Sequence, residues 1–412
     1  MSDPQPLPAM PTVTPSAVKV PPLTAPRALR VLIVVDGRYP ATGGAEMQAR
    51  LLASSLRAAG HQVQVLAPRL DHSSPRHDWI DGIEVTRLQY PRWRGVGALL
   101  LNLRFGAWLM RHRGQFDAVH IHMMHNLAGA AGWMRPLIGI PVAVKVSGAA
   151  EFEGGVLDPA LRGMLKHRFL NAGSRRLDAF QCISSHTARM MLAAGYPAQR
   201  LHFIPNAVDV ARFTRAEVAD PRVMRVVFVG RHVPVKSLDV LLRAWSLLRL
   251  PNRARLVLAG DGPEHKALRG LAEELGIAGS VEFPGMVRNV PELLAGASLY
   301  VQASRSEGLP NSVLEAMAAA LPVVATRISG HEDVVRDGES GLLVPVGEPQ
   351  ALADALQRLF DDPALRRRLG DAGRATVERE YDVPVVLRRL CNMYVARGDG
   401  DAQRELSDGA RL

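Results

Sequence analysis

Short apolar runs alternate with helix-like segments along most of the chain. The runs at 29–35, 63–67 and 141–146 are rich in β-branched residues, which is typical of strands buried on both faces of a parallel sheet. Between the first two runs, apolar positions from Ala45 to Ala59 have helical spacing, and Gly60 follows. Strands that alternate with helices predict βαβ units and a doubly wound sheet.

The same alternation begins again in the second half of the chain. Apolar runs at 225–230, 256–260, 281–285 and 297–301 are separated by helix-like segments. A chain of 412 residues is long for one domain and natural for two. We therefore predict an α/β protein with two doubly wound parallel-sheet domains.

The stretch from Ser304 to Ala318 combines a tight loop with a helix. Gly308 lets the backbone approach a ligand closely, and Pro310 suits the first turn of a helix. The residues with helical spacing that follow are Val313, Leu314, Met317 and Leu321. A strand, a loop and a helix in this order direct free N–H groups at the loop, so the stretch predicts an anion site that suits phosphate.

Two carboxylates lie on either side of this predicted anion site. Glu307 is in the loop and Glu315 is on the helix. A carboxylate accepts hydrogen bonds from sugar hydroxyls, so Glu307 suits a sugar ring and Glu315 suits a ribose, with phosphates between them. The alternative is a surface loop followed by a helix with an exposed glutamate.

The motif E-G-x-P-x-x-x-L-E-A-M-A, from Glu307 to Ala318, with L-P-V-V-A-T after it, resembles the signature of glycosyltransferase family 4. The similarity extends over about residues 29–396 and is strongest in the second half. This resemblance implies the GT-B fold, with two Rossmann-like domains facing a cleft, and a retaining enzyme that uses no metal and no cofactor.

The resemblance also implies a division of the chain. We expect these parts: a disordered tail at 1–28, an N-terminal acceptor-binding domain at 29–208, a hinge at 209–224, a C-terminal nucleotide-sugar-binding domain at 225–384, a helix returning to the first domain at 385–397, and a frayed tail at 398–412.

The residues that match family motifs receive roles from the resemblance. Arg231 and Lys236, in G-R-x-x-x-x-K after a buried strand, can grip a diphosphate, and with Glu307 they form the predicted catalytic set. The residues expected to bind the donor are Gly43, Gly44, Gly308, Leu309, Pro310, Asn311, Glu315, Met286 and Val287. Alone, the Gly43-Gly44 pair indicates no more than a turn, and Met286 and Val287 are equally compatible with the core.

The first half departs from the family pattern at Ser147, where many relatives carry a histidine that contacts the donor sugar. Serine cannot carry a charge, so this contact is in question, and we assign candidate sugar or acceptor contacts to His120, Ser147 and Glu151. His120 and His122 share one face of a strand. No carboxylate or cysteine stands with them, so we predict no metal site.

The formal net charge of +10 is unevenly distributed. Residues 1–210 hold 23 Lys and Arg against 13 Asp and Glu, whereas residues 211–412 hold 27 of each class. The excess predicts an anionic partner for the first domain, such as a membrane surface or a charged acceptor. The alternative is that the positive charge only keeps the protein soluble. The segment 91–113 is basic, aromatic and amphipathic, so it suits either a membrane-surface helix or an ordinary domain helix.

We expect neither a signal peptide nor a membrane span, because residues 1–26 lack an apolar core and the apolar stretch 96–110 contains Asn102 and Arg104. The two cysteines, Cys182 and Cys391, are expected to be buried thiols. We therefore expect a cytoplasmic protein, peripheral at the inner face of the cytoplasmic membrane if the basic domain binds lipid.

The predicted activity is transfer of a sugar from a UDP- or GDP-linked donor to a hydroxyl of a saccharide or lipid-linked acceptor in envelope or extracellular polysaccharide or glycolipid synthesis. Nucleic acid is not an expected partner. Alternatives are a nucleotide-sugar epimerase of the same fold, a non-catalytic nucleotide-sugar-binding protein and a non-catalytic peripheral membrane protein.

Overall fold

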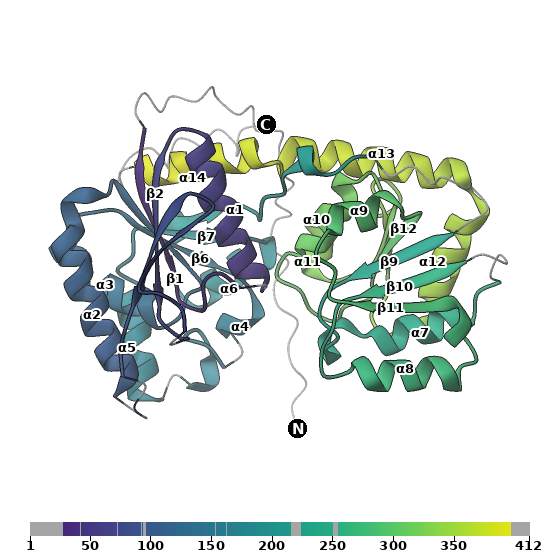
Figure 1. The fold of residues 1–412 in the computed structure, drawn as a ribbon, viewed down its shortest axis with the longest axis horizontal. Helices are drawn as coiled ribbons and strands as arrows, with labels where there is room; N and C mark the ends of the chain where they lie inside the picture. The colour runs from purple at the N-terminus through teal and green to yellow at the C-terminus, as the bar shows by residue number, and fades with distance from the viewer. Residues whose placement is uncertain are drawn as a thin grey trace.

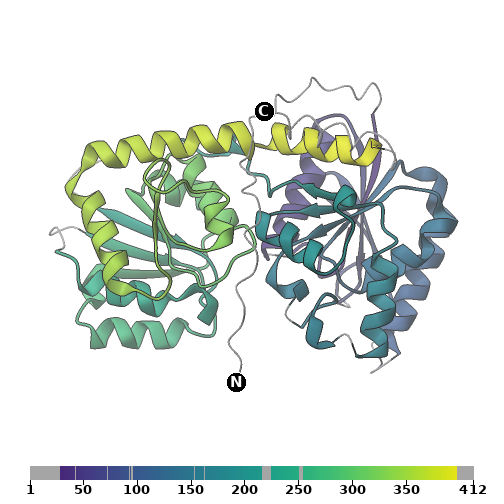
Figure 2. The ribbon, with the colours of Figure 1, turned by 180° about the vertical axis from the view of Figure 1, so that it is seen from behind.

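The structure is a computed structural model that describes residues 28–396, except for 42, 72, 92, 94–95, 153, 162, 216–223 and 250–253. Two α/β domains lie side by side, and two helices near the C-terminus run along one edge of both domains (Figures 1 and 2). The predicted tails lie outside the described residues, apart from residue 28.

The first domain is built on a sheet with strand order β3-β4-β2-β1-β5-β6-β7-β8, in which only the β3–β4 pair is antiparallel. Its strands are β1 (Arg30–Val35), β2 (Gln62–Pro68), β3 (His77–Ile80), β4 (Ile83–Leu88), β5 (Ala118–His122), β6 (Val142–Val146), β7 (Ala179–Cys182) and β8 (Leu201–Phe203). Its α-helices are α1 (Gly44–Ala58), α2 (Gly97–His112), α3 (Asn126–Ile138), α4 (Ala149–Phe152), α5 (Leu165–Ser174) and α6 (Ser185–Ala193).

The second domain is built on a parallel sheet with strand order β11-β10-β9-β12-β13-β14. Its strands are β9 (Arg225–Val229), β10 (Arg255–Ala259), β11 (Val281–Gly285), β12 (Leu299–Gln302), β13 (Val323–Thr326) and β14 (Leu342–Val344). Its α-helices are α7 (Leu238–Ser246), α8 (His265–Glu274), α9 (Val290–Ala295), α10 (Asn311–Ala318), α11 (Ser329–Glu332), α12 (Pro349–Asp361) and α13 (Pro363–Glu380).

Both sheets are covered by helices on both faces, which is why their central strands are buried and mostly apolar. On β1, Leu32 and Val34 enter the core on one face, whereas Ile33 and Val35 enter the core on the other. Polar side chains therefore concentrate where the strands end, at the carboxyl edges of the two sheets, which is where doubly wound folds bind ligands.

The last helix, α14 (Val383–Val395), packs on the first domain although it follows the second in the chain (Figure 1). Its apolar face joins the core formed by α1 and the first sheet, to which it contributes Val386, Leu387, Leu390, Cys391, Met393 and Tyr394. The chain crosses between the domains beside Val208, whose N–H donates to the carbonyl oxygen of Tyr381 (2.9 Å). The second domain is thus linked to the first at two points of the chain.

Several details differ from the sequence predictions. The antiparallel β3–β4 pair was not predicted, and Pro310 caps α10 instead of occupying its first turn.

Other sequence expectations can also be located in the structure. In α2, Leu101, Phe105 and Leu109 pack in the core. Arg92 and Arg94 of the predicted basic segment lie outside the described residues. Both cysteines are buried and free, as predicted. No helix within the described residues is long and apolar enough to cross a bilayer.

Candidate functional site

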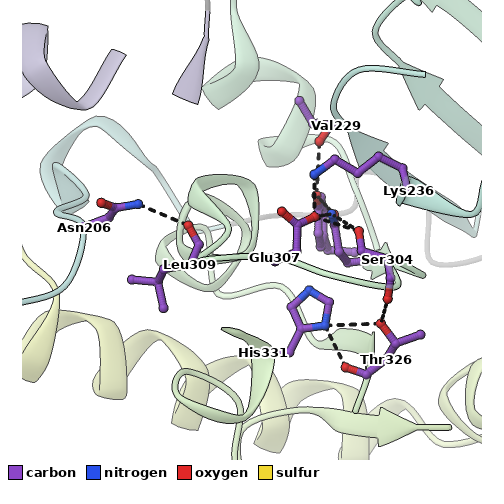
Figure 3. A network of polar contacts seen from close by, with 10 residues as sticks. Asn206, Val229, Lys236, Ser304, Glu307, Leu309, Thr326 and His331 are labelled. Atoms are coloured by element: carbon purple, nitrogen blue, oxygen red, sulfur yellow. Dashed lines mark hydrogen bonds and ion pairs between the residues drawn. The ribbon is translucent and has the colours of Figure 1, made fainter. Parts of the chain in front are cut away.

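Glu307 lies just beyond the end of β12, inside a cluster of polar groups (Figure 3). Its Oε1 atom accepts hydrogen bonds from Gln302 Nε2 (2.9 Å) and Ser304 Oγ (2.7 Å), and it forms an ion pair with Lys236. The exposed fractions of the two charged side chains are 13% for Glu307 and 19% for Lys236. The carboxylate is therefore held in one orientation before any ligand is present.

The protonation state of Glu307 follows from these neighbours. Burial alone would raise the pKa of this carboxyl, but the Lys236 ammonium and the Ser304 hydroxyl outweigh it and lower the pKa below its usual value. His331, which is buried behind Glu307, has a lowered pKa because its ring is desolvated. Glu307 is thus a carboxylate at neutral pH.

A second layer of hydrogen bonds supports the Glu307 loop. Thr326 Oγ1 donates to the carbonyl oxygen of Ser304 (2.5 Å), and His331 Nδ1 lies 2.7 Å from the carbonyl oxygen of Thr326 (Figure 3). Sequence reasoning did not assign Gln302, Ser304 or His331 to the site. Polar side chains at alternate positions where a buried strand ends were the available signal for Gln302 and Ser304.

Lys236 comes from the loop that follows β9, in a short 3₁₀ turn at Pro234–Lys236. Arg305 joins this loop to the Glu307 loop, because its N–H donates to the carbonyl oxygen of Val235 (2.8 Å) and its Nε to Ser237 Oγ (2.9 Å). Arg231 lies at the start of the same loop and is exposed. The structure thus holds the Lys236 and Glu307 loops together and leaves Arg231 open to solvent.

The Gly308 loop also touches the first domain. A Cβ atom on Gly308 would lie 2.3 Å from the carbonyl oxygen of Ser147, and one on Gly148 would lie 2.9 Å from the Gly308 Cα atom. These separations are too short for any side chain. Glycine at both positions therefore allows the two backbones to meet.

We predict that Gly308→Ala weakens the contact between the domains. The added methyl group would displace the Ser147 loop, which lies on the opposite domain, and a misplacement of about 1 Å in a reacting pair costs on the order of 100-fold in rate. Steady-state kinetics and nucleotide titration should therefore show a lower rate with little change in nucleotide affinity. Gly279→Ala is the control, because its Cβ would meet nothing within 4 Å; equal rates for the two variants would refute the prediction.

Asn206 connects the domains at a second point. Its Nδ2 donates to the carbonyl oxygen of Leu309 (3.1 Å) and to Asn311 Oδ1 (2.8 Å), and Asn311 Nδ2 donates to the carbonyl oxygen of Gly44 (3.3 Å). The Gly43-Gly44 turn and the Gly308–Asn311 loop are therefore neighbours. The sequence did not reveal the role of Asn206.

Glu315 lies on α10, the helix that follows the Glu307 loop, and is half-buried. Burial raises the pKa of its carboxyl to about 7, because the nearby Arg212 offsets the desolvation only in part. A half-buried carboxylate without a strong cationic partner is costly to the fold. Such a group suits a ligand that supplies hydrogen-bond donors.

We predict that Glu315→Gln stabilises the ligand-free protein at pH 8 but not at pH 4.5. A carboxyl whose folded pKa is raised binds more protons in the folded state, so its ionisation destabilises the fold as pH rises from about 4.5 to 7. Removing that charge should increase stability by about 1–3 kcal/mol at pH 8. Thermal unfolding at the two pH values measures the effect; a lower melting temperature at pH 8 would contradict it.

The predicted contacts in the first domain occupy different environments. His120 is buried under α14, where its Nδ1 lies 2.6 Å from the Tyr394 hydroxyl, so it packs the core and has no access to a sugar. Ser147 reaches the domain contact, and its N–H donates to Glu151 Oε1 (2.9 Å). Glu151 is buried, so it supports the Ser147 loop from behind.

The other predicted donor residues lie at the edge of the second sheet. Met286, just beyond β11, is 63% exposed, which excludes the alternative that it belongs to the core, and Val287 is half-buried. No group of three or more His, Cys, Asp or Glu side chains within the described residues is arranged to hold a metal ion.

The arrangement as a whole combines a fixed ammonium, an exposed guanidinium, a fixed carboxylate and a loop of backbone groups at the carboxyl edge of a parallel sheet. Lys236 and Arg231 can neutralise a diphosphate, and the loop before α10 offers N–H groups. Glu307 lies where these elements meet. The site is suited to stabilising an anionic leaving group next to a bound group that carries hydroxyls.

Two family profiles match the chain. Residues 43–207 match the glycosyl transferase 4-like domain, and residues 212–376 match the glycosyl transferases group 1. D-inositol 3-phosphate glycosyltransferase of Thermomonospora curvata is 32% identical over 69% of this chain and 73% of that protein.

A further relative is the lipopolysaccharide core biosynthesis glycosyltransferase LpsE of Rhizobium meliloti, 33% identical over 50% of this chain. The match spans 61% of the length of LpsE, which is less than two thirds. Among solved structures, HepE of Anabaena in complex with UDP has a TM-score of 0.73 at 19% identity and covers 90% of this chain and 100% of HepE, which supports the GT-B fold.

Proposed function

Because the chain belongs to glycosyltransferase family 4, we propose that it transfers a sugar from a nucleoside-diphosphate sugar to an acceptor hydroxyl, with retention at the anomeric carbon. The observation that carries this proposal is the Lys236–Glu307 pair, fixed beside the Gly308 loop where the two domains meet. The structural relative HepE has been solved with UDP-glucose, which supports a nucleotide-sugar donor and makes UDP the first nucleotide to test.

The main barrier in such a transfer is the negative charge that develops on the leaving diphosphate. Arg231, Lys236 and the N–H groups at the start of α10 would stabilise that charge. In the proposed front-face reaction, the bond between the anomeric carbon and the phosphate oxygen breaks as the acceptor oxygen bonds to the same face. The acceptor proton passes to the leaving phosphate oxygen, so the step needs neither a metal ion nor a general base.

The two carboxylates would divide the rest of the donor. Glu307 would accept hydrogen bonds from sugar hydroxyls and stabilise positive charge near the ring, and Lys236 would then turn from Glu307 towards the phosphates. Glu315 would accept hydrogen bonds from the ribose hydroxyls, which replace the water lost on burial. Its raised pKa implies that donor affinity increases with pH up to about 7.

The acceptor is proposed to be a saccharide or lipid-linked saccharide in envelope or extracellular polysaccharide synthesis. The lipopolysaccharide core enzyme LpsE supports this assignment, as does the positive charge of the first domain. We place the reaction in the cytoplasm, at the inner face of the cytoplasmic membrane.

Thermal unfolding with UDP, GDP, ADP and TDP and their sugars, each with and without EDTA, tests the donor site. A ligand that binds only the folded state raises the melting temperature by mass action. We expect one nucleotide to give a clear shift that EDTA leaves unchanged. No shift of the melting temperature with any nucleotide would contradict the proposal. In a separate activity assay, conversion of the nucleotide sugar without an acceptor would indicate an epimerase.

A further inference from the structure

The helix α5 lies on the outside of the first domain (Figure 1), and it carries large apolar side chains that are exposed to solvent. Leu165 is 82% exposed and Phe169 is 55% exposed, and they lie one turn apart on the same face of the helix. Met164, which caps the helix, is 52% exposed. Neighbouring apolar residues exposed to this degree indicate a surface that a membrane or another molecule covers.

The same helix is strongly basic. Residues 165–176 contain Lys166, Arg168, Arg175 and Arg176 and no acidic residue. In α13 of the second domain, by contrast, the Arg374 guanidinium pairs with the Glu378 carboxylate one turn further along the same helix. An exposed apolar face on a helix that carries cations and no acidic residue of its own is typical of helices that lie in the interface of an anionic bilayer.

A basic groove lies beside the apolar face, between α5 and the end of α6. It has a volume of about 450 Å³ and is lined by His167, Arg168, Asn171 and Arg175, with no carboxylate among its lining residues. Arg175 donates to the carbonyl oxygens of Ala194 and Gly195, so its charge is fixed in place and faces no acid there. The groove is large enough for a phosphate headgroup.

Aromatic contacts hold this surface rigid. The Trp133 ring of α3 stacks on Phe169 with centroids 5.0 Å apart, and Arg176 lies over the Trp133 ring at 3.9 Å. Because α5 leads into β7 of a parallel sheet, its N-terminal end points to the carboxyl edge, where the proposed site lies. The apolar residues at that end are therefore on the side of the domain where an acceptor would enter.

We propose that α5 docks the protein on anionic phospholipid, with Leu165 and Phe169 inserted among the acyl chains and a headgroup phosphate in the groove between α5 and α6. This α5 surface is distinct from the segment 91–113 that the sequence indicated. The inference rests on the membrane location proposed above and does not depend on the nucleotide or the sugar.

Vesicle co-sedimentation tests the α5 surface with the full-length protein. Vesicles of phosphatidylcholine alone are compared with vesicles that contain phosphatidylglycerol. The double variant Leu165→Ser, Phe169→Ser should bind anionic vesicles at least about tenfold more weakly than the wild type, because each buried apolar side chain contributes strongly to partitioning. Arg168→Gln should weaken binding and reduce its dependence on salt. Sugar transfer to a soluble acceptor should stay unchanged in both variants.

Two matched controls locate the effect. Leu247→Ser removes a side chain of similar exposure from the second domain, and Leu99→Ser, Leu103→Ser removes the exposed apolar face of α2.

Equal vesicle binding by the wild type and the α5 double variant, or a loss of binding confined to the α2 variant, would overturn the inference about α5. The proposed membrane location of the protein would still stand. A wild type that does not bind anionic vesicles would overturn both, with donor turnover still measurable. A dimer in solution that the α5 variant dissociates, without vesicle binding, would assign the surface to a second copy.

Discussion

Replacing Glu307 with alanine is expected to lower the rate of sugar transfer by about a thousandfold while nucleotide remains bound. The carboxylate is fixed by Gln302, Ser304 and Lys236, so its charge is aimed at one point of the site. Loss of one preorganised electrostatic group costs about 100- to 1,000-fold in rate. UDP should bind at least as well as before, because Lys236 is then free to contact phosphate. The rate of UDP release during turnover measures sugar transfer, and calorimetric titration with UDP measures nucleotide affinity.

The conservative variant Glu307→Gln separates charge from shape, since glutamine keeps the hydrogen bonds to the loop but not the charge. It should be nearly as slow as the alanine variant. Glu274→Gln, at an exposed position on α8, is the control and should be fully active. Full activity of Glu307→Gln would remove the carboxylate from the mechanism.

Replacing Lys236 with methionine is expected to weaken UDP binding by about 10- to 100-fold, because a charge-assisted hydrogen bond contributes about 1.5–3 kcal/mol. The same change should destabilise the ligand-free protein at neutral pH, since Glu307 is left as a largely buried anion, and breaking a buried pair costs about 3–5 kcal/mol. Calorimetric titration and thermal unfolding measure the two effects.

The sign of the pH dependence follows from the lowered pKa of Glu307. A carboxyl with a lowered folded pKa stabilises the fold above its unfolded pKa, and that contribution is lost as pH falls through the folded value. The Lys236→Met variant should therefore lose most stability near pH 7 and less in acid. Adding Glu307→Gln to Lys236→Met should restore stability but not activity. Unchanged UDP affinity in Lys236→Met would remove Lys236 from the phosphate site.

The fold was predictable from local pattern because the central strands are buried on both faces, so most of their residues are apolar, as in β1 and β9. The two-domain parallel-sheet architecture and the Glu307 motif followed from such runs and from one long signature. The sequence also placed Lys236 and Glu307 in one site. Their 71-residue separation is bridged by strands β9 and β12, which are neighbours in the sheet.

Contacts between the domains were not predictable in the same way. Asn206 and Leu309 are 103 residues apart, and Ser185 donates its N–H to Asp333 across 148 residues (2.7 Å). Neither pair belongs to a periodic pattern. His120 shows the opposite error, since it was assigned as a candidate sugar or acceptor contact, but α14 returns from the end of the chain and covers it.

The most direct test of retaining transfer at this site is the configuration of the first product formed from the donor identified by thermal unfolding. Proton NMR of the product made with a soluble acceptor gives the configuration of the new glycosidic bond, which does not mutarotate. From an α-linked donor sugar the account predicts an α-linked product and stoichiometric release of nucleoside diphosphate, both formed about a thousandfold more slowly by Glu307→Ala. A β-linked product, or a wild-type rate of transfer by Glu307→Ala, would contradict it.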